Sequence, residues 1–192
     1  MWGDDHNIVA VENDQDIAAM YLDLYPNDQV LVEDANEYLL FNYEKYDFIW
    51  SSPPCPTHSR MVHLKKQNEK YVMKYPDMRL YQEIILLKSF YKGWWVVENV
   101  KSYYDPLIKP QESGGHYFWS NVKIPSLQSR KKVRNDKGYT LEKKMQEKGI
   151  FIKNFYNYKK DKRTLLNNAI EGDLGLAILE NVKKGVKNSE FI

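Results

Sequence analysis

The chain has 192 residues, 43% of them hydrophobic, and a net charge of +2, which is ordinary for one soluble domain with its own core. No apolar run reaches the length of a membrane span, and the N-terminus lacks the features of a secretory signal. We therefore expect a cytoplasmic protein with no membrane partner. The single cysteine excludes an internal disulfide, and without CxxC or HExxH motifs we expect no metal site.

The hydrophobic periodicity predicts strands that alternate with helices. In chain order we expect a strand over 8–11, a helix over 14–25, a strand over 30–32, a helix over 35–42, a strand over 48–50, a helix over 80–90 and a strand over 94–97. Later come strand pieces at 117–119 and 122–124, a strand over 149–152 and a closing helix over 165–182 that glycines interrupt. This alternation indicates an α/β domain with a mainly parallel sheet.

Positive charge is concentrated in residues 120–163. This segment holds 14 Lys and Arg against 4 Asp and Glu, a local net charge of +10, whereas the remainder of the chain carries −8. A basic segment on an acidic body is typical of a protein with a polyanionic partner. A solvated lysine-rich surface is the equal alternative.

Polar or reactive residues follow each of the first four predicted strands. They are Glu12 with Asn13, Asp34, Pro53 with Cys55, and Glu98 with Asn99. Parallel sheets bind their ligands outside the carboxyl ends of the strands, so we expect all of these groups at one rim. The only cysteine and a carboxylate would then share a site.

Two of these segments resemble the signatures of the DNA cytosine-C5 methyltransferases. The segment Ser52-Pro53-Pro54-Cys55-Pro56 is similar to the nucleophile loop of that family, and Glu98-Asn99-Val100 is similar to its second signature, about 43 residues later. Asn167-Asn168-Ala169 is similar to the segment that closes the family's cofactor pocket. The matches run in family order from about residue 7 to residue 181.

The resemblance implies a Rossmann-like class I S-adenosylmethionine-dependent methyltransferase sheet with helices on both faces, in a single catalytic domain spanning residues 1–192. Its cofactor would be S-adenosylmethionine, and its partner would be double-stranded DNA with a flipped-out cytosine. The basic insertion at about 120–163 would face that DNA. Cys55 would be the nucleophile and Glu98 the carboxyl group that holds the base, because thiolate addition at C6 is what makes C5 reactive.

The resemblance also assigns supporting residues. Glu12 and Asp34 would bind the ribose and adenine of the cofactor, and the other cofactor-pocket residues would be Asn13, Pro53 and Asn168. Asn99 either takes part in catalysis or holds the turn. Arg130 is carried over from the family's Gln-x-Arg-x-Arg element, which positions the base.

One family feature has no counterpart: the glycine-rich cofactor loop and the strand before it. We therefore expect either a truncated chain, an unusual pocket, or half of a split enzyme whose second chain supplies the glycine loop. The alternative function is a catalytically incomplete DNA-binding fragment. A cysteine hydrolase is a third class; it would need a histidine directed at the thiol, and His58 is nearest in sequence.

Overall fold

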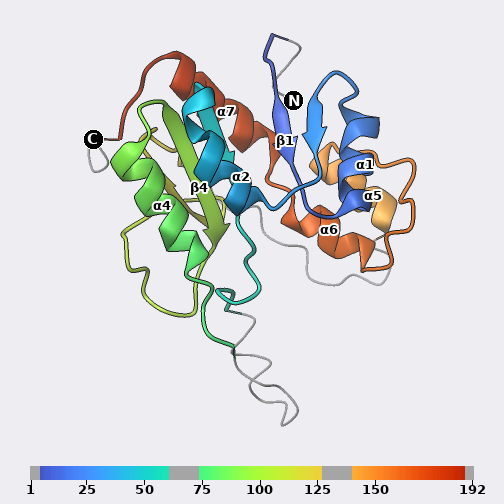
Figure 1. The fold of residues 1–192 in the computed structure, drawn as a ribbon. Coiled ribbons are helices and arrows are strands. Elements are labelled where there is room, and N and C mark those ends of the chain that lie inside the picture. The colour runs from blue at the N-terminus through green and yellow to red at the C-terminus, as the bar shows by residue number, and fades with distance from the viewer. Residues whose placement is uncertain (1–4, 61–73, 127–139, 189–192) are drawn as a thin grey trace. The chain divides into compact units, whose positions relative to one another are not determined.

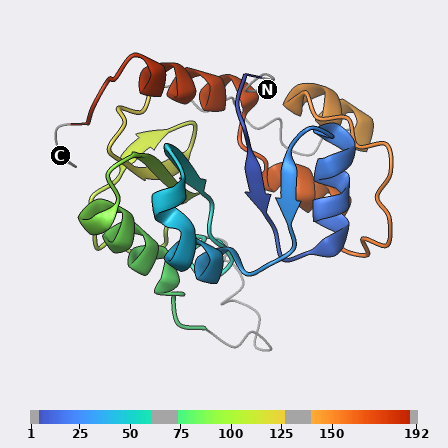
Figure 2. The same ribbon diagram turned by 45° about the horizontal axis from the view of Figure 1, so that its top comes forward.

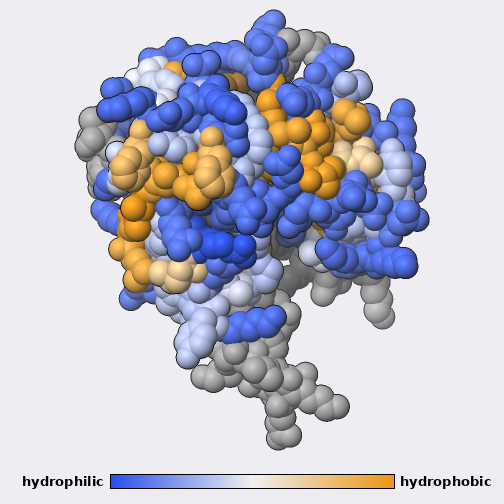
Figure 3. Space-filling view, viewed as in Figure 1, coloured by the Kyte–Doolittle hydropathy of each residue, from blue (hydrophilic) through white to orange (hydrophobic). Residues whose placement is uncertain are grey.

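The computed structural model describes residues 5–60, 74–126 and 140–188 (Figure 1). They divide into two compact units, the first made of residues 1–41 and 131–179 and the second of residues 42–130 and 180–192. Within the described ranges, no helix has the length and apolar character needed to cross a membrane. The face shown in Figure 3 is mostly hydrophilic, with apolar areas among the hydrophilic ones.

The first unit is built around a pair of parallel strands. Its elements are β1 (Val9–Val11), α1 (Gln15–Leu24), β2 (Gln29–Leu31), α5 (Leu141–Lys148) and α6 (Lys162–Asn168). Two further helices, α2 (Ala35–Asn42) and α7 (Gly172–Lys183), begin in this unit and end in the other. β1 pairs with β2 in parallel register, with Val9 opposite Gln29, and α5 packs against α6.

Local chemistry explains where the helices of this unit begin and end. Asp14 starts α1, because its carboxylate accepts hydrogen bonds from the amides of Asp16 and Ile17 at 3.1 and 3.3 Å. Gly149 ends α5 in the left-handed conformation, with φ of 65°. The next amide, that of Ile150, turns back to the Met145 carbonyl at 3.1 Å, which completes a Schellman cap.

The second unit is a four-stranded mixed sheet. Its elements are the 3-10 helix η1 (Tyr43–Lys45), β3 (Phe48–Ser51), α4 (Arg79–Phe90), β4 (Trp94–Val100), β5 (Gln111–Ser113) and β6 (His116–Ser120). The strand order is β3-β4-β6-β5; β3 and β4 are parallel, and β6 is antiparallel to both of its neighbours. Figures 1 and 2 show α4 alongside this sheet, and its buried residues Ile84 and Leu87 supply part of the core.

The α/β class is confirmed, and the first six predicted elements lie within two residues of their predicted ends. The expectation of one mainly parallel sheet is wrong, because the described strands form two sheets and the later strand pairs are antiparallel. The predicted strand over 149–152 is also wrong, since Gly149 caps α5. Residues 122–124 form only a bridge from Val122 to Lys187, and the closing helix is two helices, α6 and α7, separated at Ala169.

Candidate active site around Cys55

Cys55 lies in a tight turn that follows β3. The Cys55 carbonyl accepts hydrogen bonds from the amides of His58 and Ser59 at 3.0 and 3.1 Å. Proline on either side of the cysteine fixes φ and removes two amide donors, which stiffens the turn. The Cys55 side chain is half-buried and forms no disulfide. The thiol is thus held in one place but is not sealed in the core.

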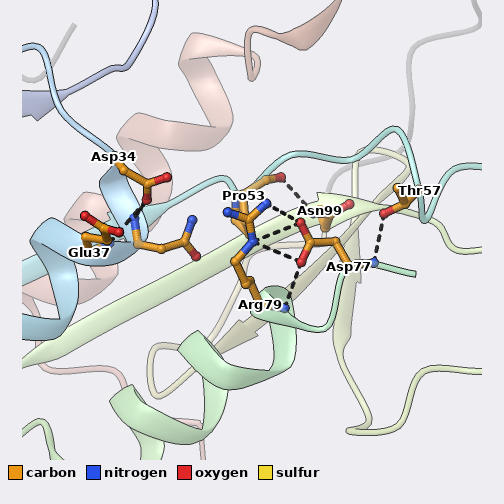
Figure 4. A network of polar contacts seen from close by, with 8 residues as sticks. Asp34, Glu37, Pro53, Thr57, Asp77, Arg79 and Asn99 are labelled. Atoms are coloured by element: carbon orange, nitrogen blue, oxygen red, sulfur yellow. Dashed lines mark hydrogen bonds and ion pairs between the residues drawn. The ribbon is translucent and has the colours of Figure 1, made fainter. Parts of the chain in front are cut away.

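Asn99 ties this turn to the sheet. Its Nδ2 donates to the Pro53 carbonyl at 2.9 Å (Figure 4), and its Oδ1 accepts from the Val100 amide at 3.0 Å. The side chain is only 2% exposed. Both polar ends of Asn99 therefore hold backbone, which is the turn-holding role rather than the catalytic one. Pro53 contributes its carbonyl to this contact.

The far side of the turn is anchored as well. Thr57 Oγ1 accepts from the Asp77 amide at 3.0 Å, and the Asp77 carboxylate pairs with Arg79 (Figure 4). The His58 carbonyl accepts from the Tyr103 amide at 3.1 Å. The turn is thus fixed both to the segment before α4 and to the segment after β4.

Glu98 lies within β4, which corrects the prediction that it follows the strand. β6 pairs with β4 as far as Val100, and this antiparallel pairing places Glu98 opposite Phe118. The side chain is 6% exposed, and its Oε1 lies 3.8 Å from His116 Nε2. Sequence reasoning missed His116, because only the β4–β6 pairing brings it near the carboxylate.

Cys55 and Glu98 are electrostatically coupled. Burial raises the pKa of the Cys55 thiol, and the negative charge of the Glu98 carboxylate raises that pKa further. The hydrogen bond from Asn99, the residue after Glu98, to the carbonyl of Pro53, two residues before Cys55, joins the two predicted segments. At rest, burial and the carboxylate charge both favour the protonated thiol.

His58 is buried in the same turn but serves a different role. Its Nδ1 lies 2.5 Å from the Tyr104 hydroxyl. Burial lowers the pKa of His58, and the opposing effect of Asp77 is smaller, so the ring is neutral near pH 7. The contacts of His58 with Tyr104 and Asp77 give no support to a cysteine hydrolase, which needs an imidazole directed at the thiol.

Two of the predicted cofactor residues lie at the carboxyl ends of β1 and β2 in the first unit. Glu12 Oε1 accepts from the Asp14 amide at 2.9 Å, which fixes the carboxylate just beyond β1. Asp34 Oδ1 accepts from the amides of Asn36 and Glu37 at 2.9 and 3.2 Å, so Asp34 caps α2 (Figure 4). Carboxylates in these positions are chemically suited to accept hydrogen bonds from ribose hydroxyls and an adenine amino group.

The remaining predicted residues are not gathered around a site. Asn13 is exposed between Glu12 and Asp14, and Asn168 is exposed at the end of α6. Arg130 lies in 127–139, outside the described residues.

The described residues of the second unit thus include a half-buried thiol whose pKa is raised by a buried carboxylate. The first unit places two carboxylates at the ends of two parallel strands. Comparison of the chain with models of known protein families, with curated proteins and with solved structures found no match.

Proposed function

We propose that the chain transfers a methyl group from S-adenosylmethionine to C5 of cytosine in DNA. The observation that carries this proposal is that Asn99 ties the Cys55 turn to β4 beside Glu98, while the Glu98 carboxylate raises the pKa of the Cys55 thiol. Cytosine C5 is too weak a nucleophile to take a methyl group unaided. As the Cys55 sulfur adds to C6, its proton passes to the Glu98 carboxylate and electron density moves onto C5, which accepts the methyl group. The adduct then collapses when water removes the C5 proton and the sulfur leaves as thiolate.

Glu98 holds the base during this addition. In its protonated form it donates a hydrogen bond to ring N3, where negative charge develops as the sulfur attacks. Protonation also removes the negative charge that raises the pKa of the thiol. His116 Nε2 lies 3.8 Å from Oε1, within ion-pair distance of Glu98. The Asn99 contact to Pro53 keeps the sulfur in position.

The cofactor supplies the methyl group when it is bound. Glu12 would accept hydrogen bonds from the ribose hydroxyls and Asp34 from the adenine amino group, whereas the exposed Asn13 and Asn168 are left without a role in this proposal.

The basic segment supports a DNA partner. Lys162 Nζ lies 4.4 Å from the centre of the Phe155 ring, and Lys160 Nζ lies 5.9 Å from the Tyr158 ring. Lys160 also pairs with Asp14 at 3.2 Å, which orders this stretch against the start of α1. Lysines bind the phosphates, and the interleaved rings are suited to stack on bases.

The direct test is tritium release from DNA labelled at cytosine C5, measured with S-adenosylmethionine present. We expect release by the unaltered chain and none by Cys55→Ser, because the hydroxyl is a far weaker nucleophile at C6. Tyr75→Ala is the control and should leave release unchanged, because Tyr75 is a 94% exposed side chain of the same unit that lies outside the Cys55 turn. Release that persists in Cys55→Ser would remove the thiol from the mechanism.

A second candidate is a DNA-binding chain that needs a partner chain to supply the glycine loop. The observation that favours it is the sheet of the first unit, which contains only β1 and β2 within the described part of the chain. Equilibrium dialysis of the isolated chain with labelled S-adenosylmethionine separates the two candidates. Micromolar binding supports the complete enzyme, and absence of binding supports the split one.

A further inference from the structure

A pocket of about 370 Å³ lies beside the Cys55 turn in the second unit. Its lining residues are Arg60, Ser102, Tyr103, Tyr104, Asp105 and Tyr117. Ligand pockets span about 300–1,000 Å³, so this volume is suited to one small ligand. None of the reactive groups assigned above lies in the lining.

The lining combines flat aromatic rings with one cation and one anion. The rings of Tyr103 and Tyr104 are 5.1 Å apart and almost perpendicular, which gives the pocket two differently oriented aromatic walls. Arg60 is positioned by a hydrogen bond of 3.2 Å from its Nε to the Ser102 carbonyl. Asp105 is exposed and places a carboxylate in the same lining.

These features select among ligand classes. A bare phosphate would pair with Arg60 but would be repelled by the Asp105 carboxylate. An apolar ligand would leave both charged groups unpaired. A nucleobase matches the tyrosine rings, the arginine and the aspartate together. It has a π face to stack on tyrosine, acceptors for an arginine and donors for a carboxylate. Guanine offers the fullest set, with O6 and N7 for Arg60 and N1–H and N2–H for Asp105.

The pocket shares its wall with the catalytic turn. Arg60 follows Cys55 by five residues, and the bridge between Ser59 and Ser102 joins the turn to the tyrosine segment. The Tyr103 amide donates to the His58 carbonyl at 3.1 Å. A strand whose cytosine reached Cys55 would therefore pass close to this pocket.

We propose that the pocket binds an unpaired nucleobase of the DNA strand that carries the target cytosine. The proposal rests on the function proposed above for its choice of DNA, and it adds a site of base recognition outside the Cys55–Glu98 pair. Tyr103 would supply the stacking face, while Arg60 and Asp105 would read the edge of the base.

The test is fluorescence anisotropy of a labelled single-stranded 12-mer deoxyoligonucleotide titrated with the full chain, without cofactor. Loss of one base-stacking contact predicts that Tyr103→Ala binds about 5- to 150-fold more weakly. Tyr103→Phe keeps the ring and should bind like the unaltered chain, which also shows that the site tolerates substitution. Tyr75→Ala is the matched control, because Tyr75 is a 94% exposed tyrosine of the same unit that lies outside the pocket.

Three outcomes would refute the base-binding proposal. They are equal affinity of Tyr103→Ala and the unaltered chain, no binding of the 12-mer at all, or binding of a base-free deoxyribose-phosphate 12-mer as tight as that of the 12-mer with bases. Because the assay contains no cofactor, it is separate from the test of methyl transfer. If the chain transfers no methyl group but Tyr103→Ala binds the 12-mer more weakly, the base-binding proposal stands and the methyl-transfer proposal fails. If the chain methylates DNA but the unaltered chain and Tyr103→Ala bind the 12-mer equally well, only the base-binding proposal fails.

Discussion

Asn99→Ala measures how firmly the Cys55 turn must be held. The change removes two hydrogen bonds to backbone, at 2.9 and 3.0 Å, from a side chain that is 2% exposed. Leaving a buried backbone group without its partner costs about 1–3 kcal/mol, so for two such groups we expect the free energy of unfolding to fall by about 2–6 kcal/mol. Urea denaturation followed by tryptophan fluorescence measures this loss.

The same variant should make Cys55 easier to reach. Every 1.4 kcal/mol of lost anchoring at the turn corresponds to about a tenfold faster alkylation by iodoacetamide. The assay reports on one site, because the chain has one cysteine.

Asn121→Ala is the matched control for this experiment. Asn121 also makes two bonds to backbone, from the Trp95 amide and to the Gly93 carbonyl, both at 2.9 Å, but at the opposite end of β4. We expect a comparable loss of stability with unchanged alkylation under conditions where both variants are folded. The reasoning is refuted if Asn99→Ala costs less than about 0.5 kcal/mol, or if the two variants speed alkylation equally.

Three further changes test the charges and the packing. Glu98→Gln should lower the pKa of Cys55, because the carboxylate charge that raises it is gone, and the pH midpoint of alkylation should move down; an unmoved midpoint would contradict the coupling. Gly93→Ala would place a methyl group 2.3 Å from the Tyr91 hydroxyl, so we expect a loss of about 3 kcal/mol in urea denaturation, and a neutral effect would be inconsistent with this packing. Burial raises the pKa of Asp14, but a lysine and two helix amides lower it more, so the pKa is lower in the folded chain than in the unfolded one. The ionised Asp14 therefore stabilises the fold above its unfolded pKa, and this stabilisation is lost as the pH falls through the folded-state pKa. In Asp14→Asn, the melting temperature should fall less steeply below about pH 4 than in the unaltered chain. Asp14→Ala should also lower the free energy of unfolding by about 1 kcal/mol at pH 7. An equally steep fall of the melting temperature in Asp14→Asn would argue against the cap.

The part of the fold that could be predicted from sequence is the part with local causes. β1, β2 and β3 are short apolar runs, and α4 repeats its buried side chains at helical spacing, so periodicity alone locates them. The prediction that Cys55 follows a strand is confirmed, because β3 ends at Ser51. Prolines and polar residues after β3 predicted the turn that carries the thiol.

The parts that failed depend on non-local pairing. Whether β4 stops at Val97 or continues to Val100 is decided by hydrogen bonds to β6, about twenty residues later, and this pairing sets which way Glu98 points. Residues 149–152 are apolar enough to suggest a strand, but Gly149 takes the left-handed conformation and ends α5 instead. The role of Asn99 could not be chosen from sequence, because its partner, the Pro53 carbonyl, is 46 residues away.

Under the proposed mechanism, the Glu98 carboxylate controls when Cys55 becomes reactive. At rest, burial and the neighbouring negative charge keep the thiol protonated, and a protonated thiol neither attacks a base nor oxidises readily. The base can be held at N3 only by the protonated carboxyl, and that form no longer disfavours the thiolate. Binding of the cytosine favours the protonated Glu98 carboxyl, and the protonated carboxyl favours binding of the cytosine, so the two events are linked. The nucleophile is then activated in the presence of its target base, without a dedicated histidine, and this agrees with His58 being engaged by Tyr104.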